Sequence, residues 1–148
     1  MADPLSIASG IAGLLSLAAA LVQTGGEYTS SVLNCPSEVQ QLVAEVSILT
    51  AVLGQLSALA ARCSVGNGRN GDLDRLRQVI TPLAIEQSKA LFQEIEEILG
   101  KYREAATKFK QAMRAAIWPR KEKEIERALA ELRKLRDNFN TAVTVDLR

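Results

Sequence analysis

The hydrophobic pattern is strongest at the N-terminus, where residues 5–22 read LSIASGIAGLLSLAAALV and carry no charge. Asp3 and Pro4 form a favourable helix start, because aspartate accepts hydrogen bonds at an N-cap and proline is tolerated at the first helical position. We expect a helix from Pro4 to about Gln23, weakened or ended by the glycine pair at 25–26. Its large side chains are separated only by small ones, so it is apolar nearly all the way round. Such a helix must be buried, either inside a protein or in a lipid bilayer.

The next helix is predicted from Pro36 or Ser37 to Cys63, where apolar residues recur at alternating steps of three and four. This heptad pattern forms one continuous stripe, and further apolar positions beside it indicate more than one neighbouring helix. Ser37 followed by Gln40 matches a capping box. The interior polar residues are mostly uncharged, so we expect this helix to be central. The stripe consists of Val39, Leu42, Val46, Leu49, Leu53, Leu56 and Ala60, with Val43, Val52 and Leu59 beside it.

Loop and proline signals divide the second half of the chain. Residues 64–71, SVGNGRNG, predict a flexible loop, and a helix follows from Asp72. Pro82 should kink or divide that helix, beyond which apolar residues continue at helical spacing. We expect a further break at Trp118–Pro119, followed by a last helix. The apolar positions of the two long segments are Leu91, Ile95, Ile98, Tyr102, Ala106, Phe109 and Met113, then Ile125, Leu129, Leu132, Leu135, Phe139 and Val143.

Composition agrees with helix-on-helix packing. Apolar residues make up 47% of the 148 residues, but aromatic residues only 4%, so the core must be aliphatic. A β-sandwich or barrel would require more β-branched and aromatic residues. We therefore expect residues 1–148 to form a single all-α domain, an antiparallel bundle of four or five helices.

The available side chains exclude several kinds of chemistry. There is no histidine, which excludes histidine-based catalytic triads and leaves zinc and haem without a ligand cluster. Cys35 and Cys63 flank one predicted helix, roughly 40 Å apart at ~1.5 Å per residue, so they cannot form a disulfide within the chain. Two unpaired thiols fit a reducing compartment. The glycine-rich loop lacks the Lys-Ser/Thr of a phosphate-binding loop. We expect no enzymatic activity and no cofactor.

Two interpretations of the N-terminal run stay open. It is either a buried helix of a soluble bundle or a helix that inserts conditionally into membranes. Its uncharged length matches the ~20 residues that span a hydrocarbon core, and its small residues recur at the four-residue spacing that lets helices associate in lipid. Asp3 stands where a signal peptide would be basic, and we expect no other stretch to span a membrane. The candidate insertion residues are Leu5, Ile7, Gly10, Ile11, Gly13, Leu14, Leu15, Leu17, Leu21 and Val22.

A basic segment extends from Lys101 to Lys123, with eight basic residues, two acidic residues and a tryptophan. It is either a solvated helix face or a contact surface for anionic lipid, to which each basic residue near the surface contributes ~1 kcal/mol. Tryptophan favours the headgroup region. With a net charge of +1 and no recognised module, we expect no nucleic-acid binding. The candidate lipid-contact residues are Lys101, Arg103, Lys108, Lys110, Arg114, Trp118, Arg120, Lys121 and Lys123.

Acidic residues also occur along the two long C-terminal segments. Charges on a helix surface do not by themselves indicate a catalytic carboxylate pair. The acidic residues after Trp118 interleave with basic residues, and we expect them to complement the helix dipole and to pair along the helix. The acidic residues before Trp118 that we expect to face solvent are Glu94, Glu96, Glu97 and Glu104.

Three stretches of the sequence resemble a known domain. They are MADPLSIASGIAGLLSLAAALVQ at the N-terminus, AEVSILTAVLGQL at 44–56 and WPRKEKEIERALAELRKLRDNFNTAVTVDLR at 118–148. Together they resemble the HeLo-like N-terminal domain of fungal proteins with immune-receptor-like architectures. The opening Asp-Pro-Leu-Ser and the run Trp118–Lys123 are the most specific parts.

The resemblance implies a cell-death effector: a helical bundle related to the membrane-permeabilising bundle of the necroptosis pseudokinase. It implies a domain that is cytoplasmic at rest, oligomerises and releases its apolar N-terminal helix into the plasma membrane. That role falls on Leu5–Val22, with Gly10 and Gly13 as close-packing positions. The resemblance also implies a sensor or nucleotide-binding domain beyond residue 148, so we expect a fragment of a longer protein. The alternative is a soluble protein-interaction or oligomerisation module whose first helix never leaves the core.

Overall fold

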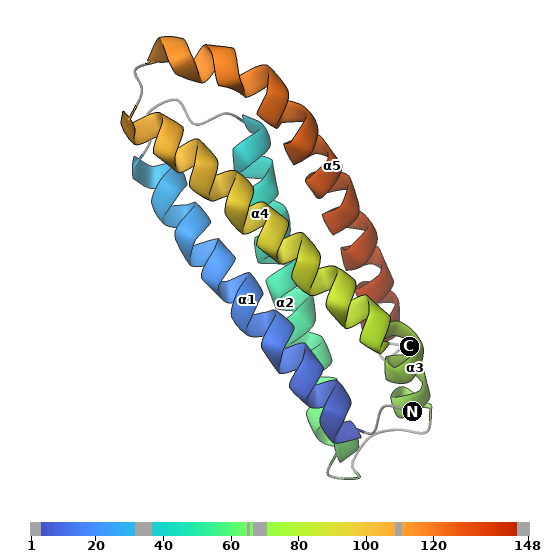
Figure 1. Cartoon of the computed structure of the whole chain (residues 1–148). Coiled ribbons are helices and arrows are strands. Elements are labelled where there is room, and N and C mark those ends of the chain that lie inside the picture. The colour runs from blue at the N-terminus through green and yellow to red at the C-terminus, as the bar shows by residue number, and fades with distance from the viewer. Residues whose placement is uncertain (1–3, 32–36, 65, 67–70, 109–110, 145–148) are drawn as a thin grey trace.

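The computed structural model is a helical bundle whose long helices run in two opposite directions (Figure 1). It describes the backbone of residues 4–31, 37–64, 66, 71–108 and 111–144, and within these the side chains of 5–27, 37–63, 66, 71–100 and 123–143. The described residues confirm the predicted all-α class. α1 and α4 run in one direction and α2 and α5 in the other, while the short α3 lies at the lower end of the bundle in Figure 1. The helices are α1 (Pro4–Ser31), α2 (Ser37–Ser64), α3 (Asp72–Val79), α4 (Pro82–Lys108) and α5 (Gln111–Thr144).

α2 has several neighbouring helices, as its widened apolar stripe predicted, although α1 and α5 also pack against three helices each. α2 packs against α1, α3 and α5. Every residue of its predicted stripe is buried, and so are Val52 and Leu59 beside the stripe. Ser37 is the first residue of the helix, where its hydroxyl donates to the carboxylate of Glu38 at 3.3 Å. The prediction that this helix touches more than one neighbour is confirmed.

α1 is longer than predicted, because it continues through the glycine pair to Ser31. Gly25 is buried, and a Cβ atom added to it would lie 2.7 Å from Cγ2 of Val43 on α2. The glycine therefore permits a close approach of two helices. Contact with α2 stabilises α1 beyond the point where the weak helix propensity of glycine predicted its end.

Pro82 separates α3 from α4, as predicted. α3 ends at Val79, and Ile80 leaves the helical conformation with φ −99° and ψ 73°. The hydroxyl of Thr81 accepts a hydrogen bond from the backbone N–H of Ala84 at 3.0 Å, which caps the start of α4. Proline fits the first position of this helix because its missing N–H would have no helical partner there.

The loop predicted at 64–71 falls largely outside the described residues. Its two described glycines, Gly66 and Gly71, have φ values of 78° and 91°, a left-handed conformation that favours glycine. The backbone N–H of Gly66 donates to the carbonyl of Cys63 at 3.3 Å, so it continues the hydrogen bonding of α2 for one further turn.

The predicted break at Trp118–Pro119 is wrong, because both residues lie inside α5. α4 ends at Lys108 and α5 begins at Gln111, well before the predicted break. A proline removes one backbone hydrogen bond, and an interior proline kinks a helix more readily than it ends one when the turns on both sides are helical. Met113, assigned to the segment before the break, accordingly belongs to α5.

Candidate functional site

The apolar N-terminal run forms most of α1, and one seam of it faces the core. Ile7, Ile11, Leu14, Ala18 and Leu21 are at most 5% exposed and follow alternating steps of four and three. This heptad seam packs against α2 and α4. The sequence contained the signal, but the residues between the seam positions are also apolar or small and conceal the period.

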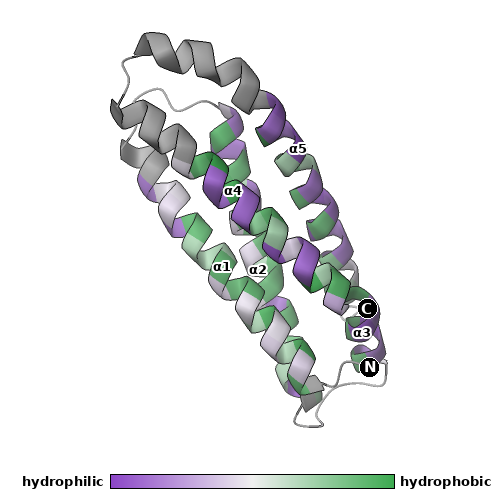
Figure 2. Cartoon of the chain, viewed as in Figure 1, coloured by the Kyte–Doolittle hydropathy of each residue, from purple (hydrophilic) through white to green (hydrophobic). Residues whose placement is uncertain are grey.

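The outer face of α1 is exposed, which corrects the expectation that a helix apolar all the way round is buried. Only 28% of its most apolar window is buried. Ser9, Ala12, Ser16 and Ala19 lie on the exposed side. Their side chains are small, so each leaves little apolar area in water. Figure 2 shows α1 in pale and green colours along most of its described length, whereas α5 carries abundant purple.

The ten candidate insertion residues therefore occupy different environments in the bundle. Leu5, at the N-terminal end of α1, has 74% of its surface exposed. Four are buried in the seam, namely Ile7, Ile11, Leu14 and Leu21. Five are partly buried, namely Gly10, Gly13, Leu15, Leu17 and Val22.

The two glycines proposed as close-packing positions differ. A Cβ atom at Gly10 would collide with Cδ1 of Ile85 on α4, so the end of the Ile85 side chain packs directly on this glycine. A Cβ atom at Gly13 would meet nothing within 4 Å. In the bundle, close packing thus occurs at Gly10 and at Gly25, which the sequence analysis did not single out.

α2 is a second helix with the length and composition of a membrane span, so the expectation of a single such stretch is wrong. The candidate spans are Leu5–Glu27 and Ser37–Cys63, and 39% of the most apolar window of the second is buried. The central helix of a soluble bundle and a membrane helix are both rich in aliphatic residues. Composition alone therefore does not distinguish α1 from α2. The two helices differ instead in the contacts that attach them to the rest of the bundle.

α2 and α5 are joined by a partly buried ion pair. Nη1 of Arg136 donates to both carboxylate oxygens of Glu45 at 2.9 Å, and Nε of Arg133 lies 3.5 Å from Oε1 of the same carboxylate. The Glu45 side chain is only 12% exposed. The analogous attachment is impossible for α1 between Leu5 and Gly26, because that stretch contains no ionisable side chain.

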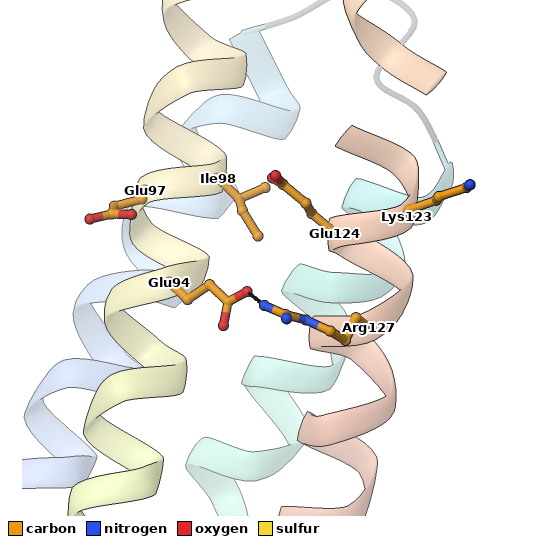
Figure 3. A pocket seen from close by; sticks show the side chains of 6 residues that line it. All are labelled: Glu94, Glu97, Ile98, Lys123, Glu124 and Arg127. Atoms are coloured by element: carbon orange, nitrogen blue, oxygen red, sulfur yellow. Dashed lines mark hydrogen bonds and ion pairs between the residues drawn. The ribbon is translucent and has the colours of Figure 1, made fainter. Parts of the chain in front are cut away.

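α4 and α5 are joined by a second ion pair, between Glu94 and Arg127 (Figure 3). The two side chains point toward each other across a shallow cleft of about 410 Å³, and Lys123 extends away from the pair. Glu94 is only half-exposed, which corrects the expectation that it simply faces solvent, whereas Glu96 and Glu97 are exposed as expected. Arg127 thus pairs with an acid of a neighbouring helix, whereas pairing along its own helix was expected.

A buried acid at the start of α3 was also missed. Asp72 is 1% exposed and forms an ion pair with Arg75 one turn later. An aspartate at a helix N-terminus followed three residues later by arginine was visible in the sequence, but burial of that pair depends on the neighbouring helices.

The basic segment lies at the end of the bundle opposite the N-terminus of α1, where α4 ends and α5 begins. Of its nine candidate lipid-contact residues, only the side chain of Lys123 is among those described, and it is exposed. The other eight fall outside the described side chains. α1 itself extends along the length of the bundle, so its first turn lies at the end opposite the basic segment.

Comparison of the chain with protein-family models, with curated proteins and with solved structures finds no match in any of the three. Within the described part of the chain, no group of three or more potential metal-binding side chains comes together.

Proposed function

We propose that the chain is a membrane-targeting effector domain that is cytoplasmic at rest, oligomerises, and permeabilises the plasma membrane by inserting α1. The supporting observation is the contrast between the two faces of α1, an aliphatic seam inside and small uncharged residues outside. A surface helix of a soluble bundle ordinarily presents charged residues to water. If Leu5–Gly26 moves from the bundle into a bilayer, no charged side chain enters the membrane with it.

The same contacts keep α1 in place in water. Exposing its four large seam side chains would cost about 6–12 kcal/mol, at 1.5–3 kcal/mol for each. That is comparable to the whole free energy of unfolding of a typical domain, about 5–15 kcal/mol. A bilayer offsets this cost, because it surrounds the seam and also Leu15, Leu17 and Val22, which the bundle covers only in part. Release is therefore coupled to a membrane or to oligomerisation.

The resemblance to the HeLo-like domain supports the cell-death and fungal-immunity role in particular. In that role a sensor or nucleotide-binding domain elsewhere in the protein supplies the activating signal. Anionic lipids are the proposed partner of the basic segment, because clustered lysine and arginine side chains bind acidic headgroups. The domain acts without catalysis, through helix release and assembly.

A soluble interaction or oligomerisation module is the second candidate. It is favoured by the seam of α1, which has the same heptad spacing as the stripe of α2 and is buried as completely. In this alternative α1 is simply a core helix, and its outer face of small residues packs against a partner helix.

Substitution of Ser16 by glutamate separates the two candidates. Ser16 is exposed midway along the apolar run, so a charge there is tolerated by the bundle but costs about 2.5–3.5 kcal/mol at the centre of a bilayer. We expect Ser16→Glu to retain the helical content and melting temperature of the wild type but to lose dye release from anionic vesicles. Ala51→Glu, at an exposed position of α2, is the matched control and should leak as the wild type does. Equal leakage by Ser16→Glu would reject insertion of α1.

A further inference from the structure

Two of the exposed large apolar side chains lie at one end of the bundle. Among the described residues, the large hydrophobic side chains left in water are Leu5, Leu83 and Ile48, which are 74%, 67% and 46% exposed. Leu5 is the second residue of α1 and Leu83 is the second residue of α4. Ile48 lies in the middle of α2.

The two helices begin with nearly the same sequence. α1 starts Pro-Leu-Ser-Ile at 4–7 and α4 starts Pro-Leu-Ala-Ile at 82–85. Residues two apart on a helix point in different directions. In both copies, therefore, the leucine is exposed while the isoleucine two positions later turns inward, with Ile7 buried and Ile85 half-buried.

These two starts lie side by side. α1 and α4 run in the same direction and are in contact (Figure 1), and Gly10 of α1 lies against Ile85 of α4. At ~1.5 Å per residue, Leu5 precedes Gly10 by roughly 7.5 Å and Leu83 precedes Ile85 by roughly 3 Å along the helices. The two leucines are therefore within roughly 5 Å of the same level on the bundle axis.

The described charges near the two leucines are largely balanced, and Glu86, one turn after Leu83, lies 3.9 Å from Lys89. The first turns of α1 and α4 contain no acidic residue, and the N-terminus of each helix carries a partial positive charge. Arg62 lies in the last turn of α2, which ends here. The acids of α3 are paired, Asp72 with Arg75 and Asp74 with Arg77.

We propose that the folded bundle docks on lipid bilayers by this end, with Leu5 and Leu83 entering the boundary between headgroups and acyl chains. Two leucines cover only a small part of the ~800 Å² per partner that a stable protein interface buries. Membrane affinity, in contrast, rises with the apolar area inserted, so two leucines give weak and reversible contact with a bilayer. The inference rests on the proposed function, because docking precedes the release of α1, but docking itself leaves the bundle folded.

The test uses Leu83, because it belongs to α4 and not to the inserting helix. Binding to vesicles of phosphatidylcholine alone is measured in the Ser16→Glu background, so that the bound fraction reports docking without insertion and without attraction of the basic segment to anionic lipid. Glutamate in the first turn of a helix is favourable, so Leu83→Glu should keep the thermal stability of its parent. We expect vesicle binding to weaken about tenfold, the loss that corresponds to one buried leucine. Leu83→Gln, which removes the apolar contact without adding charge, should also weaken binding. Ile48→Glu should not.

Each outcome separates docking from insertion. Unchanged vesicle binding by Leu83→Glu, or an equal loss with Ile48→Glu, overturns the docking inference and leaves the insertion of α1 standing. Leakage by Ser16→Glu at the wild-type rate rejects insertion, whereas loss of binding through Leu83→Glu in that same background still supports docking. If size-exclusion chromatography shows that Leu83→Glu alters the oligomeric state while vesicle binding is unchanged, this end contacts a second copy of the chain and the inference is wrong.

Discussion

Gly25 of α1 lies directly against Val43 of α2, where a side-chain carbon added to the glycine would be 2.7 Å from Cγ2 of the valine. The residue that local propensity marks as the end of the first helix is thus a point of close contact between two helices. We expect Gly25→Ala to lower the free energy of unfolding by about 1–3 kcal/mol, because overpacking forces the two helices apart.

The neighbouring glycine supplies the control for that prediction. A Cβ atom at Gly26 would meet nothing within 4 Å, so Gly26→Ala should leave stability unchanged or raise it by up to ~1 kcal/mol through helix propensity. Val43→Ala combined with Gly25→Ala should recover part of the loss. Urea denaturation gives all three values. Equal effects of Gly25→Ala and Gly26→Ala would show that propensity matters here and close packing does not.

The ion pair between Glu45 and Arg136 should contribute measurably to the attachment of α5. Because the carboxylate is only 12% exposed, Glu45→Gln should lower the free energy of unfolding by about 1–3 kcal/mol. Arg133 contacts the same carboxylate but its side chain is 51% exposed, so Arg133→Gln should change stability by less than about 0.5 kcal/mol. The account is contradicted if the Arg133 substitution proves as destabilising as the Glu45 substitution in the same urea titration.

The basic segment gives an electrostatic prediction that is independent of α1. Reversing the charges of Lys108, Lys110, Lys121 and Lys123 should weaken binding to phosphatidylserine-containing vesicles, more strongly at low salt, where exposed charges are screened least. Co-sedimentation at two salt concentrations measures the effect. If the wild type binds neutral and anionic vesicles equally, the segment is only a solvated helix face.

The structural features that depend on the spacing of apolar residues and on Pro82 were predicted correctly from the sequence. The stripe of α2, the division at Pro82 and the all-α class follow from residue spacing, because spacing determines which helix face is buried. The sequence predicted helix ends poorly at Gly25 and at Trp118–Pro119. At Gly25 the local signal was overridden by contact with a neighbouring helix, which no single stretch of sequence contains.

The pairing of charges also lay beyond sequence reasoning. Glu45 and Arg136 are far apart in the chain, and so are Glu94 and Arg127, and a helical pattern gives no information about which distant residue faces which. The exposed outer face of α1 was missed for a different reason. A run of small and apolar residues predicts burial on average, but small side chains are tolerated in water because each exposes little area.

The most direct test of the central claim locks α1 to α2 with a disulfide. The Cβ positions of residues 25 and 43 are 3.5 Å apart, within the range of about 3.5–4.5 Å that disulfides require. The variant combines Gly25→Cys and Val43→Cys with Cys35→Ser and Cys63→Ser, and its dye release from anionic vesicles is measured oxidised and reduced. The account predicts no release in the oxidised form and recovery on reduction, because α1 must leave α2 to enter the bilayer. Equal dye release by the oxidised and reduced forms would contradict it.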